Sequence, residues 1–137
     1  MDRFGTAVNC IDGRAQTPVN DWMRLHCNVS YVDMITTPGA EAVLSNGHKE
    51  RAESIERKVR LSIGVHFSEI VAVVGHFDCA ANGCEREERL EMILDAVETV
   101  RSWGLGVRII GLYVNELWSV EVVSDSGQQE KEIRSYL

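Results

Sequence analysis

The stretch that decides the fold is IVAVVGHFDC, residues 70–79. Its first five residues are all apolar and mostly β-branched, which favours a strand. A strand that is apolar at every position is typical of a parallel sheet, because helices cover both faces of such a sheet. The sequence therefore predicts a buried strand over 70–74, followed by a loop of small residues over 75–83.

Segments on both sides of this strand alternate between strand-like and helix-like patterns. The spacing of Ala52, Ile55, Val59 and Ile63 is that of one helix face. A short helix is expected to end at residue 44, with Thr37 as its N-cap and Pro38 at its first helical position. Further helices are expected over 48–65, 85–103 and 128–137. Strands are expected over 5–11, ending in a turn at Asp12-Gly13, over 30–35 and 107–114, and over 118–123 as a candidate antiparallel edge strand.

This alternation predicts an α/β fold with a mainly parallel central sheet flanked by helices. We expect roughly four parallel strands and one antiparallel edge strand. The length of 137 residues suits one domain, residues 1–137.

The charge balance bears on the class of partner. The chain has 14 Lys+Arg and 21 Asp+Glu, for a net charge of −7. This balance argues against a nucleic-acid or anionic-membrane partner, either of which needs a basic face. No apolar run approaches a membrane span, and the N-terminus lacks a signal-peptide pattern, so we expect a cytoplasmic protein.

Four cysteines, Cys10, Cys27, Cys79 and Cys84, raise the question of disulfides. In a reducing compartment, a cysteine is more often a metal ligand, a nucleophile or a small buried side chain. Disulfides are therefore not expected.

Two predicted strands end in residues that can bind a metal. His76 and Cys79 are separated by two residues, a spacing that can bring an imidazole and a thiolate to one ion. Cys10 follows the first strand and can supply a third ligand if the two strands are neighbours. A Cys₂His set with an open fourth position is typical of catalytic zinc.

Asp12 and Arg14 follow Cys10 at intervals of two. In extended chain, Asp12 points to the Cys10 side, where it can take the fourth zinc position or accept a hydrogen bond from zinc-bound water. The Arg14 guanidinium can hold this carboxylate in bidentate fashion. The alternative is a structural salt bridge at a turn.

Other residues are expected to lie outside the metal site. Cys84 is expected to be a semi-buried thiol at a helix start rather than a spare ligand or a redox partner of Cys79. Asp78 is expected to cap its turn more readily than to contact the metal ligands. Core or surface positions are expected for His26 and Cys27, and solvent-facing helix ends for His48 and His66. Core or dimer contacts are expected for Trp22, Trp103 and Trp118, and a solvated helix start for the charged run 85–89.

The motifs Cys10-Ile11-Asp12-Gly13-Arg14 and His76-Phe77-Asp78-Cys79 resemble those of the β-class carbonic anhydrases. The apolar strand ending in Gly75-His76 and the Pro38-Gly39 loop are also similar to that family. The resemblance covers roughly residues 7–123. The chain departs from the family pattern at Gly13, where a small hydroxyl residue is usual, and at Ala80, where glycine is common.

The resemblance implies that Cys10, His76 and Cys79 bind Zn²⁺, and that Asp12 and Arg14 form a gating dyad in which Asp12 can become the fourth ligand. It also implies hydration of carbon dioxide to bicarbonate by zinc-bound hydroxide, in a homodimer or higher homo-oligomer. The alternatives are a carbon disulfide or carbonyl sulfide hydrolase and a non-catalytic zinc-binding homologue. Only nine residues precede Cys10, so the family's N-terminal arm is expected to be absent and a second subunit to complete the site.

Overall fold

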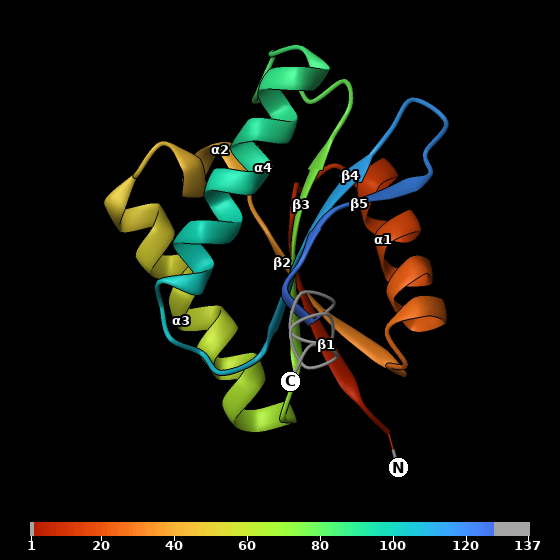
Figure 1. Cartoon of the computed structure of the whole chain (residues 1–137), viewed down its shortest axis with the longest axis vertical. Coiled ribbons are helices and arrows are strands. Elements are labelled where there is room, and N and C mark those ends of the chain that lie inside the picture. The colour runs from red at the N-terminus through yellow and green to blue at the C-terminus, as the bar shows by residue number, and fades with distance from the viewer. Residues whose placement is uncertain (1, 128–137) are drawn as a thin grey trace, which may run out of the picture.

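A five-stranded sheet with helices on both faces forms the structure, a computed structural model that describes residues 2–127 (Figure 1). The strand order is β2-β1-β3-β4-β5, and only β5 runs antiparallel to its neighbour. The strands are β1 (Phe4–Asn9), β2 (Tyr31–Thr36), β3 (Ile70–His76), β4 (Arg108–Val114) and β5 (Val120–Asp125). The helices are α1 (Gly13–His26), α2 (Ala40–Ser45), α3 (Lys49–His66) and α4 (Arg86–Arg101). The predicted fold class is confirmed, while the helix expected over 128–137 lies outside the described residues.

Two apolar layers hold the sheet between its helices. All seven residues of β3 are buried, and alternate side chains point to opposite faces. Val71 and Val73 pack with α2, α3 and α4 on one face, whereas Ala72 and Val74 pack with α1 on the other. Figure 1 shows α1 alone on its side of the sheet. The covered strand predicted over 70–74 therefore lies in the middle of the sheet.

Helix α1 is the element that the sequence pattern failed to predict. Gly13 begins it and Pro18 lies inside it, and both residues have low helix propensity. Two features outweigh this: Asp12 accepts a hydrogen bond from the Arg14 amide as N-cap, and a narrow apolar stripe is buried. The stripe consists of Ala15, Val19 and Met23, at spacings of four.

The start of α2 also differs from the prediction. Gly39, with φ of 59° and ψ of 52°, is the N-cap, so Thr37 does not cap this helix and Pro38 lies outside it. The left-handed backbone at Gly39 separates Pro38 from the helical residues, and the Gly39 carbonyl accepts from the Ala42 and Val43 amides.

Strand β3 extends two residues beyond the prediction, to His76. The extension arises because Gly75 and His76 pair with Tyr113 and Val114 of β4. His76 is thus held by the sheet rather than by a loop, which limits its freedom.

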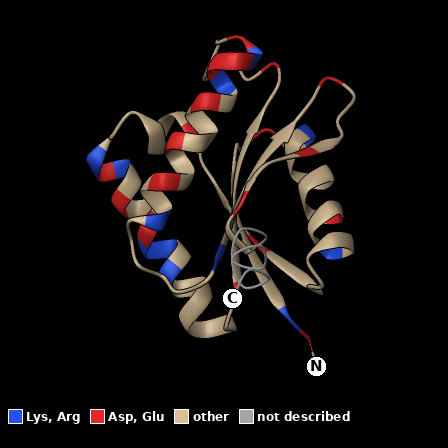
Figure 2. Ribbon diagram, viewed as in Figure 1, with Lys and Arg blue, Asp and Glu red and all other residues tan. Residues whose placement is uncertain are grey.

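Charges of both signs are interspersed on α3 and α4, as Figure 2 shows. The run 85–89 was expected to be solvated, but Arg89 is only 3% exposed, because it turns inward toward Glu41. Within residues 2–127, no helix combines the length and apolar content needed to cross a bilayer.

Helix α4 approaches the sheet closely over two glycines. A Cβ at Gly111 would lie 3.0 Å from Ile93 Cγ2 and 3.0 Å from Val97 Cγ2, and Gly75 meets Ile93 in the same way. These contacts leave no space for a methyl group unless α4 shifts.

We predict that Gly111→Ala lowers the free energy of unfolding by about 1–3 kcal/mol, because the added methyl overpacks the α4–sheet contact. Gly64→Ala is the matched control: this site in α3 is exposed, with nothing within 4 Å, so alanine should stabilise by up to about 1 kcal/mol. Urea denaturation measures both. Equal effects of the two changes would contradict the close packing.

Candidate metal centre

Cys10 lies directly after β1, at the carboxyl end of the parallel strands. The buried Asn9 side chain fixes this bend: its Oδ1 accepts from the Cys10 amide at 2.7 Å, and its Nδ2 donates to the Ala15 carbonyl at 3.2 Å. Cys10 is 4% exposed. The thiol is therefore held at the junction between β1 and α1.

His76 is fully buried, and its two ring nitrogens have different surroundings. Nδ1 is 2.6 Å from the Phe77 carbonyl oxygen, which can only accept, so Nδ1 carries the proton. Nε2 is then the lone-pair nitrogen, and it has no hydrogen-bond partner within the described chain. An imidazole whose other nitrogen is held by a backbone carbonyl is the usual arrangement of a metal ligand.

Cys79 completes a group of three donors. One ligand atom from each of Cys10, His76 and Cys79 lies within 4.8 Å of the others. The two sulfurs are 3.9 Å apart, and both thiols are free. Two sulfurs on one zinc ion are about 3.8 Å apart, given Zn–S bonds of about 2.3 Å and tetrahedral angles. The residues therefore fit zinc, and a zinc ion bound to them would give Nε2 the partner that it lacks among residues 2–127.

Burial raises the pKa of the Cys79 thiol, and the Ala81 backbone amide opposes this by hydrogen bonding to it. Cys27 and Cys84 are partly exposed and belong to no such group among residues 2–127. The expectation that Cys84 precedes a helix as a semi-buried thiol agrees with its place before α4.

Asp12 and Arg14 form a close pair beside this cluster. Arg14 Nη2 donates to Asp12 Oδ2 at 2.6 Å, and Arg14 Nε donates to Oδ1 at 3.1 Å. These hydrogen bonds lower the pKa of Asp12 to about 2, so it is ionised at neutral pH. The Asp12 carboxylate is not among the converging donor atoms, because Arg14 holds it.

Arg14 has two further contacts that the sequence did not reveal. Its Nη1 donates to Asp78 Oδ2 at 3.3 Å, so Asp78 contacts the dyad rather than capping its turn. Its guanidinium carbon lies 4.9 Å from the centre of the Trp118 ring. Trp118, with φ of 56°, lies in the connection between β4 and β5 and also contacts Phe77. No local pattern predicts this placement, because the hairpin alone brings Trp118 to the site.

Three buried polar residues near the cluster were also missed: Glu41, Asn82 and Arg89, at 0%, 8% and 3% exposure. One signal for Glu41 was available, since it is the charged residue of the otherwise apolar segment 40–44. The Arg89 signal was masked by its charged neighbours at 85–88.

The other histidines lie elsewhere. His48 is exposed at the start of α3, as expected for a helix-end residue. His66 ends α3 and is also exposed, as expected, with a side chain that is 42% exposed and that stacks on Phe4 and bonds Asp33.

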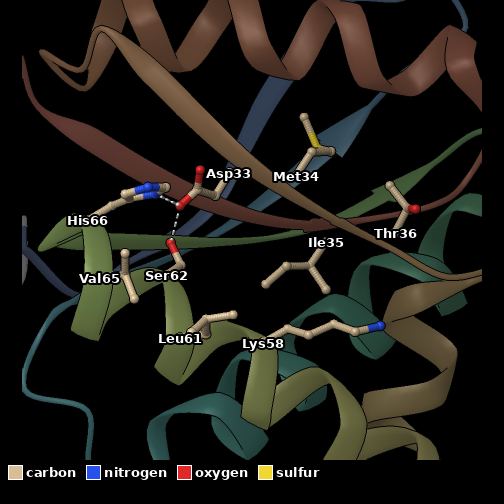
Figure 3. A pocket seen from close by; sticks show the side chains of 9 residues that line it. All are labelled: Asp33, Met34, Ile35, Thr36, Lys58, Leu61, Ser62, Val65 and His66. Atoms are coloured by element: carbon tan, nitrogen blue, oxygen red, sulfur yellow. Dashed lines mark hydrogen bonds and ion pairs between the residues drawn. The ribbon is translucent and has the colours of Figure 1, made fainter.

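A cavity of about 510 Å³ lies between β2 and α3 (Figure 3). Its polar side chains Asp33, Ser62 and His66 are the residue types of a serine-hydrolase catalytic triad, but their hydrogen bonds follow a different pattern. Ser62 and His66 both bond Asp33 Oδ2, each at 2.7 Å, whereas a catalytic serine donates to the imidazole. The cavity is otherwise mainly apolar and contains none of the three metal-ligand candidates.

Comparisons with known proteins bear on the family. A sequence-family model described as "Putative carbonic anhydrase" matches residues 1–124. No curated protein sequence matches the chain.

Three solved structures with a similar fold come from work on carbonic anhydrases. The carbonic anhydrase from Glaciozyma antarctica is 14% identical with a TM-score of 0.60, over 87% of this chain and 81% of that one. β-Carbonic anhydrase isoform I from Trichomonas vaginalis is 15% identical with a TM-score of 0.59, over 88% and 82%. A structure from work on two tetrameric β-carbonic anhydrases of Sordaria macrospora is 9% identical with a TM-score of 0.52, over 89% and 81%. At these identities the likeness shows the fold.

Thiol reactivity offers a test of the site geometry. We predict that Cys84 and Cys27 react first with an aromatic disulfide reagent, and that Cys10 and Cys79, each 4% exposed, react slowly until the protein unfolds. Burial raises the pKa of Cys27, so Cys84 should be the faster of the first two. Cys84→Ser should remove a fast phase and Cys10→Ser a slow one. The reverse assignment would contradict the structure.

Proposed function

The chain belongs to the family described as putative carbonic anhydrases, and we propose that it is a zinc-dependent enzyme that hydrates carbon dioxide to bicarbonate. The observation that carries the proposal is the convergence of Cys10, His76 and Cys79, with a buried Nε2 that lacks a partner within residues 2–127. The net reaction joins water and carbon dioxide and releases one proton.

Cys10 Sγ, His76 Nε2 and Cys79 Sγ are the ligands in this proposal. Two thiolates and an imidazole suit zinc better than the hard cations, which prefer oxygen. Three protein ligands leave the fourth coordination position for water or substrate. A zinc ion held by these three residues would supply a strong nucleophile from water at neutral pH.

Asp12 is the proposed hydrogen-bond acceptor for the reacting water. The Arg14 guanidinium keeps this carboxylate ionised, with a pKa of about 2, and fixes its orientation. An ionised oxygen at this place can accept a hydrogen bond from the reacting water, which turns a water lone pair toward carbon dioxide. Arg14 is a positioning residue, held in turn by Asp78 and Trp118.

The pairing of Asp12 with Arg14 favours catalysis over a role limited to holding zinc. A closed, non-catalytic site needs a fourth protein ligand, and Asp12 was the leading candidate. In the structure its carboxylate has four contacts of 3.2 Å or less with Arg14 and does not converge with the three donors. This arrangement supports a fourth position that is open to small molecules.

We predict that the zinc-loaded protein hydrates carbon dioxide in a stopped-flow assay with a pH indicator. Asp12→Asn should lower kcat/KM about 100-fold or more, because the amide cannot serve as an ionised acceptor. Arg14→Lys should lower it about 10- to 100-fold, because lysine lacks the planar fork that orients Asp12. Cys79→Ser should lose both zinc and activity.

The control is Arg3→Lys, which alters an exposed arginine–carboxylate pair with Glu69 that is remote from the site in the sheet. The kcat/KM of Arg3→Lys for carbon dioxide hydration should match that of the wild type. Tight zinc binding without hydration would contradict the proposed reaction, and hydrolysis of carbon disulfide or carbonyl sulfide by that same protein would identify the alternative activity.

We also propose a homodimer or a higher assembly of identical chains. The outer edge of β2 pairs with no other strand of the described sheet. Exposed apolar side chains lie along this edge and α3: Tyr31, Leu61 and Val65 are 52%, 63% and 58% exposed. The tetrameric β-carbonic anhydrases of Sordaria macrospora belong to the same fold.

Sedimentation velocity at micromolar concentration tests this assembly. The wild type should sediment as at least a dimer, and Leu61→Glu with Val65→Glu should shift it to monomer, because charges would be buried in the contact. Glu53→Lys in the same helix is the control. A monomeric wild type would contradict the assembly.

The proposed location is the cytoplasm. Four free thiols, two of them proposed as zinc ligands, remain available only in a reducing compartment.

A further inference from the structure

Glu41 and Arg89 form a buried charged pair next to the metal-ligand candidates. Glu41 lies on α2 and is 0% exposed, and Arg89 lies on α4 and is 3% exposed. The Glu41 carboxyl carbon would be 3.3 Å from a Cβ on Gly75, the residue before His76. Burying two charges costs free energy that a mutual contact recovers only with good geometry. The pair therefore needs an explanation beyond stability.

The geometry of the pair itself is poor. Arg89 Nε is 3.9 Å from Glu41 Oε1, and neither Nε nor Glu41 Oε2 has a hydrogen-bond partner in the described part of the chain. Arg89 instead uses Nη2 to donate to the backbone carbonyls of Asn82 and Cys84. Its best hydrogen bonds thus go to the loop that follows Cys79.

Asn82 joins this pair to the Cys79 turn. Its side-chain Nδ2 donates to Glu41 Oε1 at 2.7 Å, and its carbonyl accepts from Arg89. Its backbone amide donates to the Cys79 carbonyl at 3.2 Å. One residue therefore links the candidate ligand to both members of the buried pair.

The loop has little else to hold it. In residues 79–83 only Cys79 and Asn82 are buried, while Ala80, Ala81 and Gly83 are exposed. Apolar burial cannot fix such a segment, because its small side chains have almost no surface to bury. The polar contacts of Asn82 must do so. An arginine suits this position, since its fork of donors can bond several acceptors at once.

We infer that Glu41, Asn82 and Arg89 are positioning residues of the metal centre: they set the place of the 79–82 turn, and through it the place of the Cys79 sulfur. This inference rests on the proposed function, because it takes Cys79 as a metal ligand. Glu41 offsets the positive charge of Arg89 in the protein interior. Hydrogen bonds connect the turn to α2 through Asn82 and Glu41, and to α4 through Arg89, so the two helices fix the position of the turn.

Asn82→Ala tests the inference, because it removes only the side-chain hydrogen bonds to Glu41 and to Met92 Sδ and keeps the backbone bonds. Zn²⁺ affinity, measured by competition with a chromophoric chelator, should fall about 10- to 100-fold. The thiolate-to-metal absorption of the Co²⁺-substituted protein should weaken or shift. Ser62→Ala is the matched control, since it removes buried hydrogen bonds to Thr6 and Asp33. It should bind Zn²⁺ within twofold of the wild type.

A rescue variant separates positioning from general stability. Glu41→Gln with Asn82→Asp exchanges donor and acceptor, so residue 41 donates to residue 82 and the net charge beside Arg89 is unchanged. This double variant should recover most of the Zn²⁺ affinity that either single change loses.

The stability of the metal-free proteins provides a second control. The urea midpoints of Asn82→Ala and Ser62→Ala should fall by similar amounts, so a difference in their Zn²⁺ affinity would not reflect a difference in stability.

The inference is overturned if Asn82→Ala binds Zn²⁺ and Co²⁺ as the wild type does, or if the double variant recovers nothing. A wild type that binds neither ion overturns the metal site and this inference together. Normal metal binding without carbon dioxide hydration overturns the proposed reaction alone and leaves the positioning role standing.

Discussion

The parallel pairing of β1 with β3 is the interaction on which the rest of the structure depends. Val8 lies opposite Val73, so continuing the register places Cys10 level with Gly75, beside His76. Two donors that are 66 positions apart in the chain thereby meet at one end of the sheet. A slip of one residue would turn the side chains of one strand to the opposite face and separate the donors. The interiors of both strands are buried, so that slip is costly, because it would move apolar side chains such as Val8 and Val73 out of their layers.

The ligand candidates are supported in two physically different ways. Cys10 and His76 are at or next to strand ends, where backbone pairing and packing hold them. Cys79 lies on a loop with few apolar contacts, and buried polar groups replace the missing apolar support. The close approach of α4 over Gly75 and Gly111 brings Arg89 within reach of that loop. Tight helix packing and the placement of a polar cluster are therefore parts of one arrangement.

Charge is balanced locally around the centre. Arg14 lies between Asp12 and Asp78, and Arg89 lies near Glu41. The hydrogen bonds from Arg14 lower the pKa of Asp12, and Arg89 places an opposite charge near the buried Glu41. The solved structures with this fold share only 9% to 15% identity with the chain. The likeness therefore shows the fold alone, and the proposed chemistry of the centre rests on this chain's own residues.

The sequence by itself determined the α/β class, the buried strand at 70–74, the antiparallel edge strand and the three candidate donors, because apolar periodicity and ligand spacing are local properties. It did not predict α1, where Gly13 and Pro18 lower helix propensity and only packing of Ala15, Val19 and Met23 compensates. It assigned Arg89 to solvent and Trp118 to a core or contact role. Tertiary structure decided those placements, because the groups that bury Arg89 and the guanidinium that lies over Trp118 come from elements far away in the chain. A pattern along the sequence reports which face of an element is apolar, but not which distant polar group will meet it.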